Sequence, residues 1–158
     1  MVARVPRTRS VMRLVRESLW RLLSPHDVPV YLGIPVSFSL SRCGLAIIDR
    51  GFAHEIRTHF RGIERRIGKV FRHARNRRVR MLNVPQIFTF PIKATHADEE
   101  ISSALLARST RELRNLAIAL PEFSFVLPAP GIGYGRREWR SVEGVLGVLP
   151  DNVTVVRR

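Results

Sequence analysis

The segment that most constrains the fold runs from Val126 to Trp139, where an apolar run is followed by glycines and then by an amphipathic run. The glycines alternate, so the backbone can adopt positive φ angles and approach a ligand closely; they are Gly131, Gly133 and Gly135. N–H groups at the start of the following helix would face an anion. The pattern predicts a strand, a turn and a helix. The turn either binds phosphate or only makes a tight exit from an α/β sheet.

This turn fits neither standard nucleotide-binding fingerprint. A Walker loop ends in Gly-Lys-Ser or Gly-Lys-Thr, whereas the last of these glycines is followed by Arg136 and Arg137. The dinucleotide fingerprint belongs to the first strand of its domain, and this turn lies near the C-terminal end of the sequence. Both assignments are therefore excluded.

Strands and helices alternate along the rest of the chain. Strands are predicted at residues 11–16, 28–36, 79–84, 87–92, 123–127 and 153–156. Helices are predicted at residues 45–70, from residue 98 onward, and at residues 139–149. The first strand segment also fits a helical stripe, so an N-terminal amphipathic helix is the alternative there. The order predicts one three-layer α/β/α fold with a mixed central sheet, whose ligands bind at the carboxyl ends of the strands.

Two details of the predicted helices carry expectations. Gly62 interrupts the first helix, so two helices meeting at a bend are the alternative to one rod. Asp98, Glu99 and Glu100 are expected to open the next helix, because acidic side chains stabilise a helix N-terminus. An acid–base pair or a metal site is the other interpretation of these carboxylates. The histidines are scattered, so we expect no metal site and no cofactor.

Length and composition indicate a single folded unit. The 158 residues suffice for one buried core, and we expect a basic tail at residues 1–9 followed by a domain at residues 10–158. The single cysteine, Cys43, excludes an internal disulfide and a multi-cysteine zinc site. No apolar run approaches the roughly 20 residues that cross a bilayer. These features predict a soluble, cytoplasmic protein with no membrane partner.

The formal net charge of +14 predicts an anionic partner. Between residues 50 and 80 the chain carries eleven Lys or Arg side chains against two glutamates. Five arginines crowd the end of the predicted helix and the connection after it, where guanidinium groups can grip phosphates: Arg72, Arg75, Arg77, Arg78 and Arg80. DNA or RNA is the expected partner of this segment, and a solvated helix face is the alternative.

Four motifs give the chain a resemblance to a known family. They are Phe90-Pro-Ile-Lys93 after one strand, Leu127-Pro-x-x-Gly-x-Gly-x-Gly before Trp139, Gly44-Leu-Ala46, and Phe60-x-Gly-Ile-Glu64. Together with the order of elements, they make most of residues 11–158 resemble the macrodomain family. More narrowly, the chain is similar to the bacterial and phage branch related to DNA ADP-ribosyl glycohydrolases.

The resemblance implies a cleft for ADP-ribose. The phosphate loop of the family corresponds to Gly131, Ile132, Gly133, Tyr134 and Gly135, with the tyrosine packing on a ribose or over the cleft. The helix opening of the family corresponds to Cys43 and Gly44. The lysine implicated in removing ADP-ribose from nucleic acid corresponds to Lys93, which an exposed solubilising role would explain equally well.

Two positions depart from the family pattern. Where the family has Gly-Asp-Leu at the adenine, this chain has Glu17 followed by Ser18 and Leu19, so a hydroxyl replaces the carboxylate. Ser37 occupies the position nearest to the asparagine of the family, and no glycine lies between Gly33 and Gly44.

Three functions from different classes therefore stay open. The first is hydrolysis of an ADP-ribosyl group on nucleic acid or protein through Lys93. The second is binding of ADP-ribose or a related nucleotide without turnover, which the two departures favour. The third is nucleic-acid binding by a basic protein in which the fold is only a scaffold.

Overall fold

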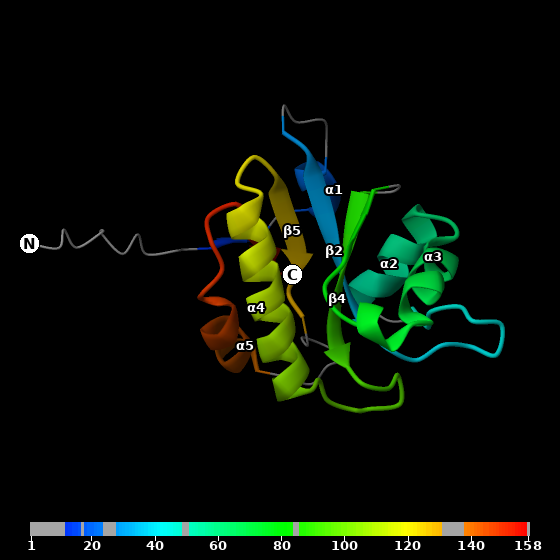
Figure 1. Ribbon diagram of the computed structural model, residues 1–158. Helices are drawn as coiled ribbons and strands as arrows, with labels where there is room; N and C mark the ends of the chain where they lie inside the picture. Colours follow the sequence, from blue (N-terminus) through cyan, green and yellow to red (C-terminus); the bar gives the residue numbers. More distant parts are fainter. Residues whose placement is uncertain are drawn as a thin grey trace, which may run out of the picture.

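The computed structural model describes residues 12–16, 18–23, 28–48, 51–83, 86–130 and 138–157 (Figure 1). The predicted basic tail and the glycines of the Val126–Trp139 segment lie outside these ranges. The strands are β1 (Arg13–Val15), β2 (Val30–Ser37), β3 (Met81–Asn83), β4 (Gln86–Lys93), β5 (Ser124–Pro128) and β6 (Val153–Val156). The helices are α1 (Leu19–Leu22), α2 (Gly51–His59), α3 (Ile63–Phe71), α4 (Ser103–Ala119) and α5 (Trp139–Leu146), with a 3-10 turn, η1 (Ala74–Asn76).

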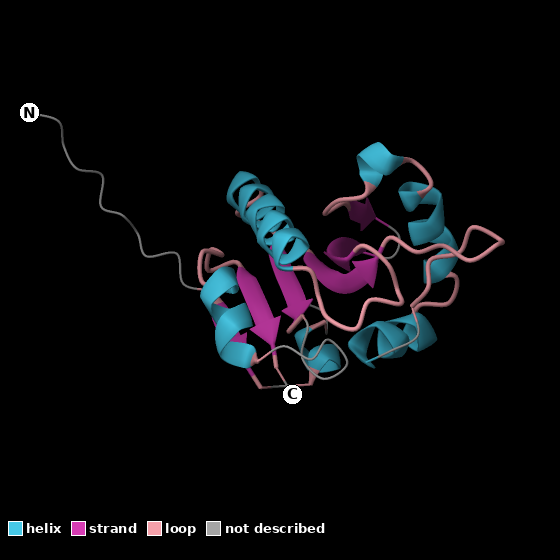
Figure 2. Cartoon of the chain, turned by 90° about the horizontal axis from the view of Figure 1, so that it is seen from below, coloured by secondary structure: helices cyan, strands magenta, loops and turns pink. Residues whose placement is uncertain are grey.

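The six strands form one mixed sheet in the order β1-β6-β5-β2-β4-β3. Every neighbouring pair is parallel except β3 and β4, which are antiparallel. The carboxyl ends of β1, β6, β5, β2 and β4 therefore meet at one edge, which we call the carboxyl edge. The arrows of β4 and β5 point toward this edge in Figure 1, and Figure 2 looks onto it from below.

Helices cover both faces of the sheet because side chains alternate along each strand. Phe88, Phe90 and Phe125 pack with α4 and α5 in one buried cluster. Leu32 and Ile34 pack with α2 and α3 in the other. The predicted α/β/α layers and the mixed sheet are confirmed.

The N-terminal segment is a strand followed by a short helix, so the alternative of one amphipathic helix is wrong for the described residues. β1 pairs with β6 in parallel, with Leu14 opposite Val155. The bend predicted at Gly62 is confirmed. This glycine adopts a φ of +83° between α2 and α3, a value that side-chain-bearing residues rarely adopt.

The predicted helix start at residue 45 is wrong. Residues 40–46 form a turn instead, in which the Ser41 amide donates to the Leu45 carbonyl at 2.8 Å and Leu40 bridges to Ala46. The Ala46 amide donates to the Glu64 carbonyl at 2.9 Å, so the turn is fastened to α3. These bonds satisfy the backbone outside a helix, and α2 begins at Gly51.

The acidic cluster does not open a helix either. α4 begins at Ser103, and the hydroxyl of Ser102 caps it by accepting from the Leu105 amide at 3.2 Å. Asp98 instead closes a turn with Thr95, whose amide and hydroxyl both donate to its carboxylate at 3.1 and 2.9 Å. The strand bounds differ from the prediction by no more than two residues, and α5 ends at Leu146.

Candidate functional site

Two of the predicted site residues lie side by side at the carboxyl edge. Ser37 ends β2 and Lys93 ends β4, and the two are register partners beyond an irregularity between Val36 and Ser37. Ser37 is buried, with 8% of its surface exposed, and Lys93 is half-buried. The sheet thus places the backbones of Ser37 and Lys93 next to each other where strand ends meet.

The loops that follow these two strands are joined to each other. The His96 amide donates to the Ser39 hydroxyl at 2.8 Å, which links the segment after β4 to the segment after β2. The pKa of the Asp98 carboxyl is lowered by the Thr95 amide, then by the Thr95 hydroxyl, and further by the positive charge of Lys93. Lys93 therefore has a carboxylate in its electrostatic neighbourhood, held by a closed turn.

Cys43 and Gly44 do not lie at a helix opening, which corrects the expectation drawn from the family resemblance. They lie in the turn of residues 40–46, where Gly44 has a φ of +77° and its amide donates to the Ser41 carbonyl at 2.9 Å. Gly44 packs on Gly68 of α3, and Cys43 is exposed. The turn follows β2, so it leaves the sheet from the carboxyl edge.

Ser18 and Leu19 also follow a strand end at this edge. Ser18 is exposed, comes after β1, and accepts the Arg21 amide with its carbonyl at 3.1 Å as α1 begins at Leu19. Trp20 fixes α1 against α2, because its indole N–H donates to Glu55 at 2.9 Å and its ring stacks on His59 with centroids 4.0 Å apart. This contact, which nothing in the sequence pattern indicated, positions Ser18.

The glycine-rich segment itself, Gly131, Ile132, Gly133, Tyr134 and Gly135, lies outside the described residues. Its two flanks are described. β5 ends at Pro128, the Ala129 amide donates to the Val156 carbonyl at 2.7 Å, and Glu138 precedes α5. The end of β5, which precedes this segment in the sequence, therefore lies at the carboxyl edge.

Trp139, at the other end of that segment, is half-buried and packs against the core. The Arg157 guanidinium lies 5.1 Å from the centroid of its ring. Trp139 therefore anchors the start of α5 to the core.

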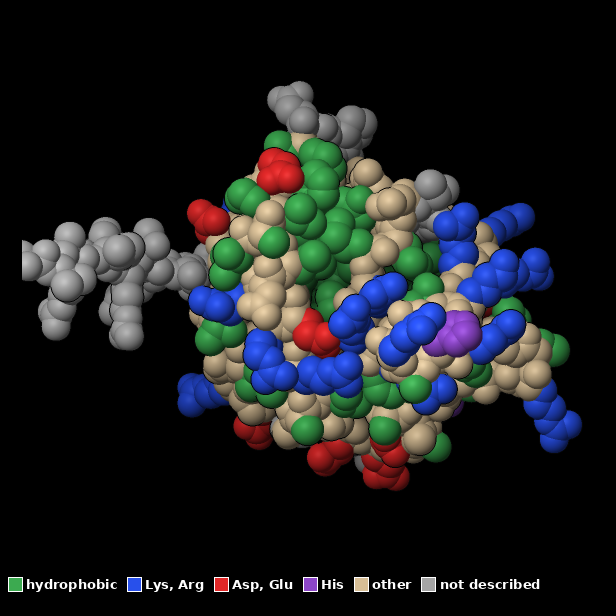
Figure 3. Space-filling view, in the orientation of Figure 1, with side chains coloured by type: hydrophobic (Ala, Val, Ile, Leu, Met, Phe, Trp, Pro, Cys, Tyr) green, Lys and Arg blue, Asp and Glu red, His purple; other side chains and the backbone are tan. Residues whose placement is uncertain are grey.

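The structure divides the five arginines of residues 72–80 into two groups. Arg72, Arg75 and Arg78 are exposed, whereas Arg77 and Arg80 are half-buried. Arg77 is held in place, since its Nε donates to the Phe71 carbonyl at 3.0 Å and its own carbonyl accepts from Arg108 at 3.2 Å. In the view of Figure 3, Lys and Arg side chains gather across the centre of the molecule and on its α3 side.

Metal-ligand clusters and membrane-spanning helices are both absent from the described residues. No three His, Cys, Asp or Glu side chains among them come together as metal ligands would. No helix in the described ranges is both long enough and apolar enough to cross a membrane.

Comparison with known proteins relates the chain to solved structures. No protein-family model and no curated protein sequence matches it. The macrodomain of Thermus aquaticus DarG has a TM-score of 0.67 at 19% identity, with 94% of this chain and 99% of that one covered. The macrodomain of Mycobacterium tuberculosis DarG gives 0.66 at 16%, with the same coverage.

A third structure was solved with a ligand. Thermosipho africanus DarTG in complex with ADP-ribose has a TM-score of 0.70 at 14% identity, over 92% of this chain and 41% of that one. These similarities extend over nearly the whole chain, and their helices and strands follow the same arrangement. The chain therefore has the macrodomain fold.

Proposed function

We propose that this chain binds ADP-ribose, free or attached to a larger molecule, at its carboxyl edge. The observation that carries the proposal is the pairing of Ser37 with Lys93 at the strand ends, in a macrodomain fold. Ligands of open α/β sheets bind outside the carboxyl ends of the strands. β5, which precedes the glycine-rich segment, ends at the same edge, and Ser18 follows β1 there. A structure similar to this one, Thermosipho africanus DarTG, was solved with ADP-ribose.

Each element of the edge has a role in this proposal. Backbone N–H groups of residues 131–135, ahead of α5, hold the diphosphate, as glycine-rich turns and helix starts do for anions. The Ser18 hydroxyl bonds to the adenine amine. The Ser37 hydroxyl and the Lys93 ammonium contact the distal ribose, where a cation near oxygen acceptors makes a charge-assisted hydrogen bond.

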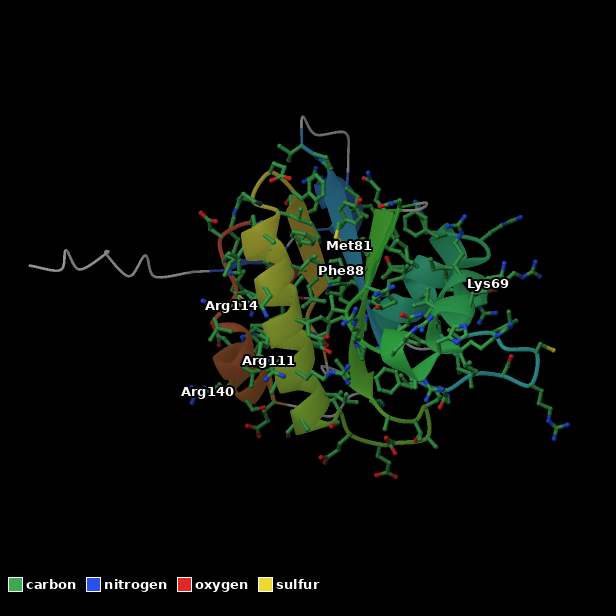
Figure 4. The ribbon with its side chains drawn as sticks, viewed as in Figure 1. Lys69, Met81, Phe88, Arg111, Arg114 and Arg140 are labelled. Atoms are coloured by element: carbon green, nitrogen blue, oxygen red, sulfur yellow. The ribbon has the colours of Figure 1, made fainter. Side chains whose placement is uncertain are left out.

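Replacing Lys93 should weaken ADP-ribose binding about tenfold, the loss expected for one charge-assisted hydrogen bond of roughly 1.5 kcal/mol. Calorimetric titration of nucleic-acid-free protein compares wild type with Lys93→Ala. Lys69→Ala is the matched control, because Lys69 is exposed on α3 (Figure 4). Saturable binding that depends on Lys93 and not on Lys69 supports the proposal. Absence of heat with the wild type, or equal affinity of both variants, rejects it.

Hydrolysis extends the proposal without changing the site. In that version the Lys93 ammonium stabilises the scissile linkage of the bound ADP-ribosyl group. Incubation with ADP-ribosylated DNA, RNA and protein separates the two versions, since binding alone yields no free ADP-ribose. A Lys93→Ala variant with full turnover would remove Lys93 from the catalytic role. The Ser37 hydroxyl in place of an amide, and the fastening of residues 40–46 to α3, favour binding without turnover.

A second function, contact with nucleic acid, is favoured by the exposed group Arg72, Arg75 and Arg78. Guanidinium groups on phosphates release counterions, so the affinity should fall steeply with salt. The half-buried pair contributes less to this proposal, because the Arg77 guanidinium already donates to the Phe71 carbonyl.

Reversing the three exposed charges together, as Arg72→Glu, Arg75→Glu and Arg78→Glu, should weaken binding of a labelled single-stranded DNA at least tenfold. Three phosphate contacts contribute a salt slope of roughly −0.7 each for single strands, so the slope should also become shallower by about 2. Fluorescence anisotropy at two salt concentrations measures both quantities. Arg61→Glu, Arg65→Glu and Arg66→Glu, which are exposed and change the charge equally, form the control. Equal losses of DNA affinity in the two triple variants would mean that the effect comes from the net charge of the protein and not from Arg72, Arg75 and Arg78.

A further inference from the structure

An open groove of about 630 Å³ lies between α4 and α5, and it uses none of the residues proposed for ADP-ribose. α4 contributes one wall and the end of α5 with the turn after it contributes the other: Ala107, Thr110, Arg111, Arg114, Val145, Gly147 and Val148. Figure 4 shows Arg111, Arg114 and Arg140 on this side of the molecule, coming from the two helices. A volume of this size accommodates several side chains of a partner.

Apolar groups make up most of the groove between the arginines. Val148 keeps 49% of its surface exposed, and Val145 is half-buried beside it. Thr110 presents no hydroxyl to a ligand, because its hydroxyl donates to the Leu106 carbonyl within α4 at 2.7 Å. The groove therefore offers apolar surface for a ligand to cover.

The charge along the groove is positive. Arg111 and Arg114 are neighbours one turn apart on α4, an arrangement of like charges that destabilises a helix. In the described ranges neither has a carboxylate within 4.0 Å, whereas Arg108 on the same helix pairs with Glu112 at 3.3 Å. Arg140 of α5 does not line the groove, but it is exposed on the same side of the molecule (Figure 4). Carboxylates of a partner molecule would balance this excess.

We propose that this groove docks an acidic amphipathic helix of a partner protein. On such a helix, apolar side chains at positions i and i+4 cover Val145 and Val148 while carboxylates on the adjoining turn pair with the arginines. The one-turn spacing of Arg111 and Arg114 matches carboxylates three or four residues apart. Sequence-independent binding of single-stranded nucleic acid uses aromatic side chains on which bases stack, and no aromatic residue is among the described residues that line this groove.

A peptide display selection tests the proposal while leaving the sequence of the partner helix free. A library of peptides of about 16 residues, long enough for four helical turns, is selected on the full chain. We expect enrichment of sequences with Asp or Glu three to four residues apart and apolar residues at i and i+4. Binding of a labelled selected peptide should fall at least tenfold on Arg111→Glu with Arg114→Glu. Selected peptides without acidic amphipathic character, or unaffected by this variant, would overturn the proposal.

Two controls keep the result specific to the groove. Arg65→Glu with Arg66→Glu makes the same change of charge on exposed positions of α3, and it should leave peptide affinity within about twofold. Val148→Asp tests the apolar surface at an exposed position and should also weaken the peptide at least tenfold. Equal losses of peptide affinity in the two double variants would refute docking of a protein helix. Displacement of the peptide by an oligonucleotide whose own binding depends on Arg111 and Arg114 would refute it as well. ADP-ribose titration of the same variants should be unchanged, so failure of this proposal and of the ADP-ribose proposal are distinguishable.

Discussion

Gly68→Ala should destabilise the protein by about 2 kcal/mol, although alanine is the better helix former by roughly 1 kcal/mol. Gly68 lies within α3, beneath the turn of residues 40–46. A Cβ there would collide with the carbonyl oxygen of Gly44 and would lie 3.2 Å from the Ala46 amide nitrogen. Overpacking of this kind costs about 1–3 kcal/mol or more, and backbone atoms cannot rotate away as a side chain can. The turn must therefore move off α3.

Urea unfolding measures the change as a fall in the midpoint at an unchanged slope. Gly144→Ala is the matched control, because Gly144 is an exposed glycine inside α5 whose added Cβ would meet nothing within 4 Å. That substitution should raise stability by up to about 1 kcal/mol through helix propensity alone. If Gly68→Ala also raised the midpoint, the turn that carries Cys43 and Gly44 would not be docked on α3.

The turn of residues 40–46 is also where the sequence pattern wrongly predicted the start of a helix. Leu45, Ile48 and Phe52 have helical spacing, and Ile48 is indeed buried. The backbone nevertheless folds back at Ser41, because a positive φ at Gly44 and the bond from Ala46 to Glu64 satisfy the polar groups without a helix. The Glu64 partner comes from a later helix, so periodicity within the segment could not reveal it.

The prediction that the acidic residues 98–100 open a helix was wrong for a local reason. Asp98 comes three residues after Thr95, and the two side chains and backbones bond to each other before any helix begins. Ser102 is the residue whose hydroxyl reaches the first turn of α4. A serine followed by an apolar run was a helix-start signal that the more conspicuous carboxylates obscured.

The central strands were predictable, and the proximity of the site residues was not. Apolar runs bounded by turn residues located β2 and β4 within one to two residues of their bounds. Their pairing, which brings Ser37 beside Lys93, depends on the sheet order, and parallel neighbours far apart in sequence leave no mark on local pattern. The family resemblance placed both residues at one cleft. Whether they bind ADP-ribose there stays a prediction.

The arginine segment shows the limit of charge counting. Composition treats Arg75 and Arg77 alike, but only the first is exposed, while Arg77 binds the carbonyl that ends α3. An electrostatic surface is defined by the side chains that packing leaves outward. The same holds for Arg108, which pairs with Glu112, and Arg111, which does not.

Asn152→Asp should destabilise the protein by about 3 kcal/mol, more than Asn152→Ala. The Asn152 side-chain nitrogen lies within hydrogen-bond distance of three carbonyl oxygens, at 3.0 Å from Ala117, 3.3 Å from Leu120 and 3.1 Å from Phe123. It thereby joins the end of α4, the connection to β5 and the start of β6. Alanine removes these bonds, which contribute about 1 kcal/mol each or less when one donor is shared. Aspartate also turns a negative charge toward the carbonyl oxygens, which no donor then satisfies.

Asn115→Asp is the control for the change of charge, because Asn115 is exposed on the same helix. It should alter the free energy of unfolding by no more than about 0.5 kcal/mol, as surface substitutions usually do. The expected order of stability by urea unfolding is wild type and Asn115→Asp, then Asn152→Ala, then Asn152→Asp. If the half-buried Asn152 side chain only faced water, its replacement would not change the stability. Equal stability of Asn152→Asp and Asn115→Asp would therefore mean that Asn152 does not hold α4 to the sheet.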